Sequence, residues 1–184
     1  KLNLKYNGGA LQTFTFSSTA AVSLGSAQVS AINLADGDDI QVTVDALGAL
    51  VFTFEDDPAY FPDGIADATA QQVVDFLSDT APQLTWAVNA GAVEATSQRA
   101  GSDSLIVITG GTATTKLGLT DSAGTGDFAF ADAAEASEVA TEINLTATGF
   151  TAVATGPRLQ LDRHDAGEVL YLGLLEGDVN GNLG

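Results

Sequence analysis

Residues 84–101 read LTWAVNAGAVEATSQRAG, and residues 150–167 read FTAVATGPRLQLDRHDAG. Each stretch begins with an apolar residue and Thr, alternates apolar with polar positions around a Gly-containing turn, and closes on Ala-Gly. Alternation with a period of two is typical of a half-buried β-strand, and two such runs around a short turn predict a β-hairpin. The chain therefore contains the same predicted hairpin twice, and the residues around each copy decide the fold.

A helix is expected before each hairpin, because apolar residues recur there at i, i+3, i+4 and i+7. In residues 68–78 (ATAQQVVDFLS) the apolar stripe consists of Ala70, Val73, Val74 and Leu77. In residues 131–144 (ADAAEASEVATEIN) it consists of Ala136, Val139, Ala140 and Ile143. Each predicted helix also begins with a pair at capping-box spacing: Thr69 with Gln72, and Asp132 with Glu135.

A third strand is expected after each hairpin, at 105–109 (LIVIT) and at 168–172 (EVLYL). Both units then contain Leu-Gly-Leu, at 117–119 and at 172–174. A second duplication lies in LNLKYNGGALQTFTF and IQVTVDALGALVFTF, which begin at Leu2 and Ile40 and both end in Phe-Thr-Phe. Both runs predict hairpins, and Asn7-Gly8 is a strong two-residue turn signal.

These patterns predict a β-rich α+β fold of two related modules, each an antiparallel sheet with one packed helix. The first module is expected at 38–119 and the second at 120–184. In one topology the N-terminal hairpin, within 1–37, completes the second module, so that the first module is inserted within the second. In the alternative topology the modules follow in tandem and 1–37 forms a separate β element.

The charge of the chain is strongly acidic, at −18 over 184 residues, and between Tyr6 and Gln98 there is no Lys or Arg. Such a surface repels phosphate, so we expect no nucleic-acid partner. No apolar run approaches the roughly 18 residues of a membrane span, so we expect no membrane partner and no signal peptide. The chain begins at Lys1 without any Met. We therefore expect either a cleaved N-terminal segment or an encoded sequence that begins upstream.

The residues that carry chemistry are few, and we expect no enzyme, no catalytic residue, no cofactor and no metal site. The chain has no Cys, and its one histidine, His164, lies between Asp162 and Asp165 in a predicted exposed turn. The segment 178–184 (DVNGNLG) starts like a calcium loop, but Leu183 stands where such a loop needs Gly. Its would-be ligands are Asp178, Asn180 and Asn182.

Two acidic loops and a few aromatic residues leave alternatives open. The loops 34–39 (LADGDD) and 55–67 (EDDPAYFPDGIAD) are either solvated turns or holders of a structural cation. Trp86 lies in an alternating strand, where core packing is expected, although a sugar-binding platform would use the same aromatic residues: Tyr60, Phe61, Trp86 and Tyr171. Tyr60 and Phe61 are expected to anchor their loop. The Gly-rich segment 109–118 (TGGTATTKLG) lacks the P-loop spacing and is expected to be a loop.

The repeat resembles a module of tailed-bacteriophage virion structural proteins. The resemblance lies in the helix ATAQQVVDFLS, the hairpin that follows, and an ending in which Gly110-Gly111-Thr112-Ala113 leads to Leu117-Gly118-Leu119. The second copy is similar to the "IN" motif of flagellar hook-associated proteins. Its matching residues are Ile143-Asn144, Phe150-Thr151-Ala152-Val153 and Arg158-Leu159-Gln160-Leu161.

The resemblance covers roughly residues 40–172 and implies an extracellular, self-assembling structural protein without catalytic residues. The expected function is that of a tailed-phage virion component: a head decoration or fibre, a neck protein or a tail accessory subunit. The expected partners are other virion proteins and further copies in a homo-oligomer. The predicted Thr/Ala/Gly faces are low in charge, which favours association. The alternatives are a bacterial surface-filament or hook-type subunit, and a carbohydrate- or host-binding module.

Overall fold

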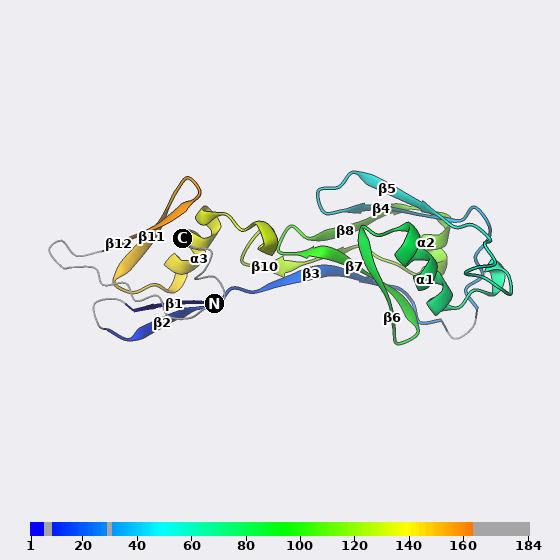
Figure 1. The fold of residues 1–184 in the computed structure, drawn as a ribbon, viewed down its shortest axis with the longest axis horizontal. Coiled ribbons are helices and arrows are strands. Elements are labelled where there is room, and N and C mark those ends of the chain that lie inside the picture. The colour runs from blue at the N-terminus through cyan, green and yellow to red at the C-terminus, as the bar shows by residue number, and fades with distance from the viewer. Residues whose placement is uncertain (6–8, 29–30, 164–184) are drawn as a thin grey trace. The chain divides into compact units, whose positions relative to one another are not determined.

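The computed structural model describes residues 1–5, 9–28 and 31–163, which belong to two compact units (Figure 1). Residues 19–125 form one unit, called here the central unit. Residues 1–18 join the chain from 126 onward in the other, called here the terminal unit. The N-terminal hairpin therefore lies in the same unit as the second repeat. Residues 19–37 belong to the central unit, which begins well before the expected boundary at 38.

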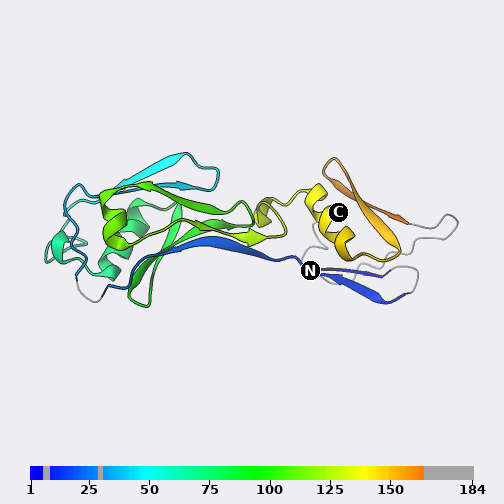
Figure 2. The same ribbon diagram turned by 180° about the vertical axis from the view of Figure 1, so that it is seen from behind.

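The central unit contains two antiparallel four-stranded sheets. The first has the order β10 (Thr125–Gly126), β3 (Ser18–Leu24), β7 (Ala92–Ala100), β6 (Leu84–Asn89). The second has the order β5 (Ala49–Thr53), β4 (Asp39–Val44), β8 (Leu105–Gly110), β9 (Ser122–Ala123). The two sheets are visible in Figure 1 and from behind in Figure 2.

The predicted single sheet of the first module is thus divided between two sheets. After β7 the chain turns through 101–104, and β8 pairs with β4 rather than with β7, with Thr43 opposite Val107. Each sheet has one apolar face, and both inner faces contribute to one core cluster, which includes Ile40, Val42, Val93 and Ala95. Two sheets bury these alternating apolar residues on both sides of one core, which a single sheet with one helix does not achieve.

The first predicted helix is confirmed as α1 (Ala70–Thr80). Its capping box is formed as predicted: the Gln72 amide donates to the Thr69 hydroxyl, and the Thr69 amide donates to Gln72 Oε1 at 2.8 Å. Val73, Val74 and Leu77 of the apolar stripe are buried, and Ala70 is partly buried against the same core. A short 3-10 helix, η1 (Ile65–Asp67), precedes α1.

The segment 109–118 is not a loop throughout, because it contains a short helix, α2 (Thr112–Leu117). Three of its six residues are Thr, which has weak helix propensity. The helix nevertheless forms because Ala113 and Leu117 are buried in the core. Gly111 precedes it at φ 104° and Gly118 follows it in the left-handed conformation. Local sequence signals were therefore insufficient to predict α2.

The terminal unit has two separate hairpins and one helix. The hairpins are β1 (Leu2–Lys5) with β2 (Leu11–Phe14), and β11 (Phe150–Thr155) with β12 (Arg158–Arg163). The helix, α3 (Ala136–Thr146), contacts both hairpins, and the three pieces share a core of Leu2, Leu4, Phe14, Ala140, Ile143, Phe150 and Ala152. The core of this unit is therefore built from two segments far apart in the sequence.

The start of α3 differs from the prediction. Asp132 lies in a 3-10 turn, η2 (Ala131–Ala133), and Ala134 is extended, so the helix begins only at Ala136. The capping interaction uses Glu138, whose carboxylate accepts the Glu135 amide at 2.8 Å. The predicted N-cap at Asp132 is thus wrong by one helical turn.

The predicted fold class, β-rich α+β with antiparallel sheets, is confirmed. The Ala90-Gly91 turn between β6 and β7 has positive φ at both residues, 51° and 82°, as a two-residue type I′ hairpin turn requires. The predicted third strand at 168–172 and the Asn7-Gly8 turn lie outside the described residues.

Candidate association surface

The carboxylates of the first acidic loop bind groups of the protein itself. Asp38 Oδ2 accepts hydrogen bonds from Lys116 Nζ at 2.6 Å and from the Ala35 amide at 2.7 Å. Burial by itself raises the pKa of the Asp38 carboxyl. The hydrogen bonds from Lys116, Thr112 and Ala35, with the charge of Lys116, outweigh burial and hold that pKa below its usual value. Asp38 therefore acts as a structural anion that joins this loop to α2.

Other acidic side chains organise the loops in the same way. Asp36 accepts the Asp56 amide at 3.1 Å, and Asp56 accepts the Ile65 amide at 2.9 Å. Hydrogen bonds from the Gln41 side chain and from the Thr112 amide lower the pKa of the Asp39 carboxyl. Across residues 1–5, 9–28 and 31–163, no group of three or more acidic or histidine side chains has the geometry of a metal site. The carboxylates of the two loops therefore accept hydrogen bonds from groups of the protein itself and hold the loops as turns.

The aromatic residues of the central unit serve packing. Trp86 is buried, and its indole N–H donates to the Ala81 carbonyl at 3.0 Å. Phe61 is buried against Phe76, and Tyr60 packs edge-on to the same ring, at 5.4 Å between ring centroids. The Tyr60 hydroxyl donates to Asp79 at 2.6 Å, and this bond, with burial and the carboxylate charge, raises the Tyr60 pKa. Core packing of Trp86 and anchoring by Tyr60 and Phe61 are therefore confirmed, and these rings do not form a sugar platform.

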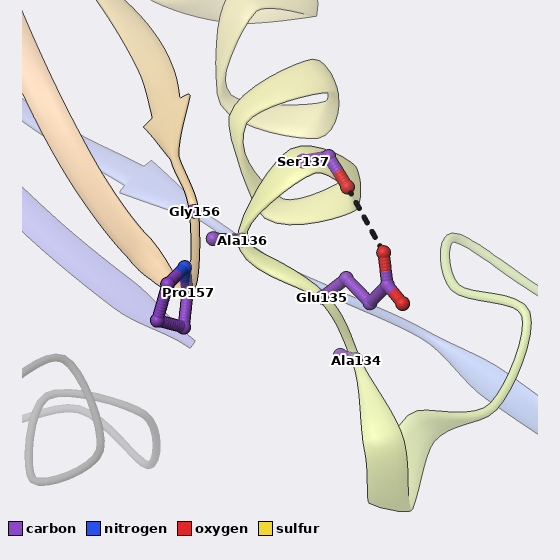
Figure 3. A pocket seen from close by; sticks show the side chains of 6 residues that line it. All are labelled: Ala134, Glu135, Ala136, Ser137, Gly156 and Pro157. Atoms are coloured by element: carbon purple, nitrogen blue, oxygen red, sulfur yellow. Dashed lines mark hydrogen bonds between the residues drawn. The ribbon is translucent and has the colours of Figure 1, made fainter.

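The described residues line several open hollows on the surface, and one of them is lined by Asp36, Glu55, Asp56, Asp57 and Pro58. Figure 3 shows another, of about 420 Å³, at the start of α3, lined by Ala134, Glu135, Ala136, Ser137, Gly156 and Pro157. Its lining residues share one hydrogen bond, from Ser137 Oγ to Glu135 at 3.4 Å. A third, of about 350 Å³, lies in the central unit and is lined by Asp45, Ala46, Leu47, Pro82, Gln83, Gln98 and Arg99. Neither of the last two brings an acid, a base and a nucleophile together.

The outer face of the sheet β5-β4-β8-β9 is a nearly uncharged surface, called here the Thr/Val face. It consists of the odd-numbered strand residues, while the even-numbered residues between them face the core: Asp39, Gln41, Thr43, Ala49, Val51, Thr53, Leu105, Val107 and Thr109. Asp39, opposite Thr53 at one end of β4, is its one carboxylate. Cross-strand pairing brings Val51 beside Gln41, and Thr43 beside both Ala49 and Val107. Val51 is 60% exposed and Leu105 is 37% exposed. A continuous strip of Thr, Val and Leu therefore faces outward on a chain of net charge −18.

The outer face of the other sheet is similar but less uniform. Val22 and Leu24 of β3 are 42% and 45% exposed, and Thr96 and Glu94 of β7 lie opposite them. Glu94 accepts a hydrogen bond from Asn89 at 2.7 Å. Each outer face carries a carboxylate, Glu94 here and Asp39 on the Thr/Val face. The Thr/Val face is the better candidate for association because it has the more exposed valine, Val51 at 60%.

Sequence reasoning predicted low-charge Thr/Ala/Gly faces that favour association, but it did not say that this particular face is one of them. The sequence did contain an indication of this face. Residues 46–54 (ALGALVFTF) contain no charged residue, although acidic residues flank the run on both sides, at Asp45 and Glu55. The alternation of this run predicts its strand and its inner face. It does not show which strands lie beside it.

Six candidate residues lie outside the described residues: His164, Asp165, Tyr171, Asp178, Asn180 and Asn182. Asp162 lies in β12 and accepts a hydrogen bond from Gln160 at 2.5 Å.

The "IN" dipeptide has a structural explanation. Ile143 is fully buried in the core of the terminal unit. The Asn144 side chain donates to the Ala152 carbonyl and accepts the Ala152 amide, both at 2.7 Å. Gln12 of β2 forms the same pair of bonds with Thr148, at 2.9 and 2.8 Å. Two side-chain amides therefore bind backbone groups that a neighbouring strand would otherwise bind. Asn144 does so at Ala152, on the edge of β11 away from β12, and Gln12 does so at Thr148, just before β11.

Comparisons of the chain with protein-family models, curated proteins and solved structures gave no match. Among the described residues, no helix is both long and apolar enough to span a bilayer.

Proposed function

We propose that this chain is a non-enzymatic structural subunit of a tailed-phage virion that acts by associating with further copies and with neighbouring virion proteins. The observation that carries the proposal is the Thr/Val face, an exposed strip of Thr, Val and Leu on an acidic chain. Exposed apolar strips bordered by polar residues are typical of protein interaction surfaces.

The distribution of charge supports association at this face. Like charges repel, so two copies that each carry −18 repel one another over most of their surface. Most acidic residues of the central unit lie in the segments 34–39 and 55–67, and of these only Asp39, the first residue of β4, belongs to a strand. Association through the Thr/Val face therefore buries apolar area with little desolvation of charge.

The assignment to a tailed-phage virion rests on the module resemblance. The motif residues have architectural roles that suit such a module: Gly111 and Gly118 bound α2, while Ile143 and Asn144 fasten α3 to β11. The same residues would serve a scaffold in any repeated assembly. The virion location is the part of the proposal that depends on the resemblance alone.

The test is native mass spectrometry of the purified chain over a concentration series, with and without calcium. We expect a discrete oligomer whose population grows with concentration and does not change with calcium. A chain that stays monomeric at every concentration would contradict the proposed association. An oligomer that forms only with calcium would contradict the view that the carboxylates of the acidic loops bind groups of the protein itself and not a cation.

A further inference from the structure

Among the described residues, the strand β5 has a free backbone edge. Figure 1 shows β5 at the margin of its sheet, and β4 is its one partner among the described strands. The Phe54 amide donates to the Asp38 carbonyl at 2.7 Å, and the Phe54 carbonyl accepts the Gly37 amide at 2.9 Å. In antiparallel sheets the backbone groups of successive residues point to alternate sides. The amides and carbonyls of Ala49, Val51 and Thr53 therefore point away from β4, and within the described chain they have no hydrogen-bond partner.

The edge lacks the usual protection against pairing. Natural sheets block their edges with charged side chains, Pro, bulges or very short strands. β5 has five residues without charge or Pro, and its pairing with β4 is regular. By contrast, β9 and β10, which close the other edges of the two sheets, have two residues each.

The remaining long edge of the central unit, β6, is less suited to pairing. Its outward backbone positions are Leu84, Trp86 and Val88, because Asn89 pairs with Ala92 across the tight turn. The Leu84 amide already donates to the Ala81 carbonyl. β5 therefore offers the longer run of free donors and acceptors.

We infer that two copies of this chain associate by antiparallel pairing of their β5 strands about a two-fold axis at Val51. This inference rests on the proposed function and names the surface and the partner. In this register Val51 faces Val51 of the second copy, and Ala49 faces Thr53 of the second copy. Every outward amide and carbonyl of the three positions then finds a partner, because a two-fold strand edge is self-complementary. The two sheets become one, and their Thr/Val faces become continuous.

A second copy fits this edge better than a charged partner does. Within the paired segment 49–53 no charged residue faces another. The nearest acid in the turn, Asp45, accepts hydrogen bonds from Ser97 Oγ at 2.7 Å and from the Leu105 amide at 2.8 Å. The one carboxylate beside β5 on this face, Asp39 opposite Thr53, already accepts hydrogen bonds from Gln41 and Thr112. A basic partner would therefore gain little there, whereas an identical acidic chain can pair along the uncharged segment 49–53. Repulsion between the remaining charges predicts that the dimer tightens as salt is added.

The experiment compares dimerisation of the full chain and its variants by sedimentation velocity, at 0.15 and 0.5 M salt (about 8 Å and 4 Å of Debye length). Val51→Glu places two carboxylates directly opposite one another and is expected to weaken the dimer at least about tenfold. The matched control is Val153→Glu, which adds the same charge at an exposed valine of β11. The control is expected to change dimerisation less than about twofold.

A mixing experiment tests the two-fold register. Val51→Lys alone is also expected to weaken the dimer, but an equimolar mixture of Val51→Glu and Val51→Lys is expected to form the mixed dimer, which native mass spectrometry identifies by mass. Such rescue would not occur if the variants were merely misfolded. Thr53→Pro is a further variant, since it removes an outward N–H without breaking a bond to β4.

The outcomes separate the inference from the proposed function. If the wild-type chain associates but Val51→Glu behaves like Val153→Glu, or the mixture gives no mixed dimer, β5 pairing is overturned and the proposed function stands. If the wild-type chain is monomeric throughout, both are overturned.

Discussion

At Asn144, one side chain supplies both hydrogen-bond partners of a backbone position. Its amide binds the N–H and the C=O of Ala152, a residue that is itself buried. Gln12 repeats this geometry at Thr148. An amide side chain resembles a peptide group, so it can take the place of a neighbouring strand. The edge of β11 is thereby occupied, whereas the edge of β5 is free.

Replacement of Asn144 by Ala is expected to destabilise the protein by about 1–2 kcal/mol, because both backbone groups of Ala152 lose their partner. Urea unfolding followed by circular dichroism measures the change. The matched control is Gln160→Ala in β12, where the lost side chain binds only Asp162 and the cost should stay within about 0.5 kcal/mol. Equal losses in the two variants would show that the Asn144 bonds contribute little.

The Asp38–Lys116 pair makes stability depend on pH in a defined direction. The pKa of Asp38 lies below 3.8 in the folded protein, so its ionised form stabilises the fold. This stabilisation is complete above the pKa of the unfolded chain and is lost as the pH falls through the folded-state pKa. Asp38→Asn should therefore cost about 1–3 kcal/mol near neutral pH, and this difference should shrink below pH 3.8.

Urea unfolding at a series of pH values, followed by the fluorescence of Trp86, measures the difference between wild type and Asp38→Asn. Lys116→Gln removes the cation that lowers the Asp38 pKa in the folded protein, so the acid-dependent loss in that variant should be smaller and should end at higher pH. A difference between wild type and Asp38→Asn that stays constant down to the most acidic pH would contradict the lowered pKa.

At the scale of elements, α2 depends on the close approach of its first turn to β4. A Cβ on Gly111 would lie 2.3 Å from the Asp39 carbonyl oxygen, and the residue has φ of 104°. Both features exclude a side chain without movement of the backbone. The short helix is thus held by the glycines at its ends and by the burial of Leu117, more than by its own helix propensity.

Gly111→Ala is expected to destabilise the central unit by about 2–3 kcal/mol through strain and overpacking. Gly48→Ala, in the β4–β5 turn, is the control, because no atom lies within 4 Å of its added Cβ and its φ is not positive. Thermal unfolding by Trp86 fluorescence compares the two. A Gly111→Ala variant as stable as Gly48→Ala would mean that α2 can shift away from β4 at little cost.

At the scale of the whole molecule, the terminal unit depends on two segments separated by the entire central unit. Leu4 of β1 is fully buried in the same core as Ile143 of α3 and Phe150 of β11. Loss of the N-terminal hairpin from this core should therefore loosen α3 and β11. The central unit has a core of its own that includes none of these residues.

Leu4→Ala is expected to cost about 2–4 kcal/mol by leaving a cavity. Hydrogen exchange should accelerate in α3 and β11 while β6 and β7 stay protected. Leu11→Ala, in the same hairpin but 51% exposed, is the control and should leave exchange unchanged. Uniform acceleration throughout the chain would instead indicate that the two units unfold as one cooperative structure.

The repeated hairpins and two of the three α-helices were determined by the sequence alone. A period of two predicts a strand and its buried face, and a period of 3.6 with Thr69 and Gln72 predicts α1. These patterns depend on residues that are close together in the sequence, so they predict the same strands and helices whichever elements become neighbours. The position of the turn at Ala90-Gly91 belongs to the same class, because glycine favours the positive φ that such turns require. The positive φ of Ala90 was not predicted, since residues other than glycine seldom adopt it.

Only the tertiary structure decided which strands are neighbours. The alternation in β8 is equally compatible with β7 or β4 as partner, and the fit of the shared core selects β4. Packing likewise formed α2 despite its threonines, and it brought Gln12 to Thr148 across most of the chain. The Thr/Val face and the free edge of β5 follow from these choices. Strand pairing and burial between distant segments depend on three-dimensional fit, which a local sequence pattern does not encode.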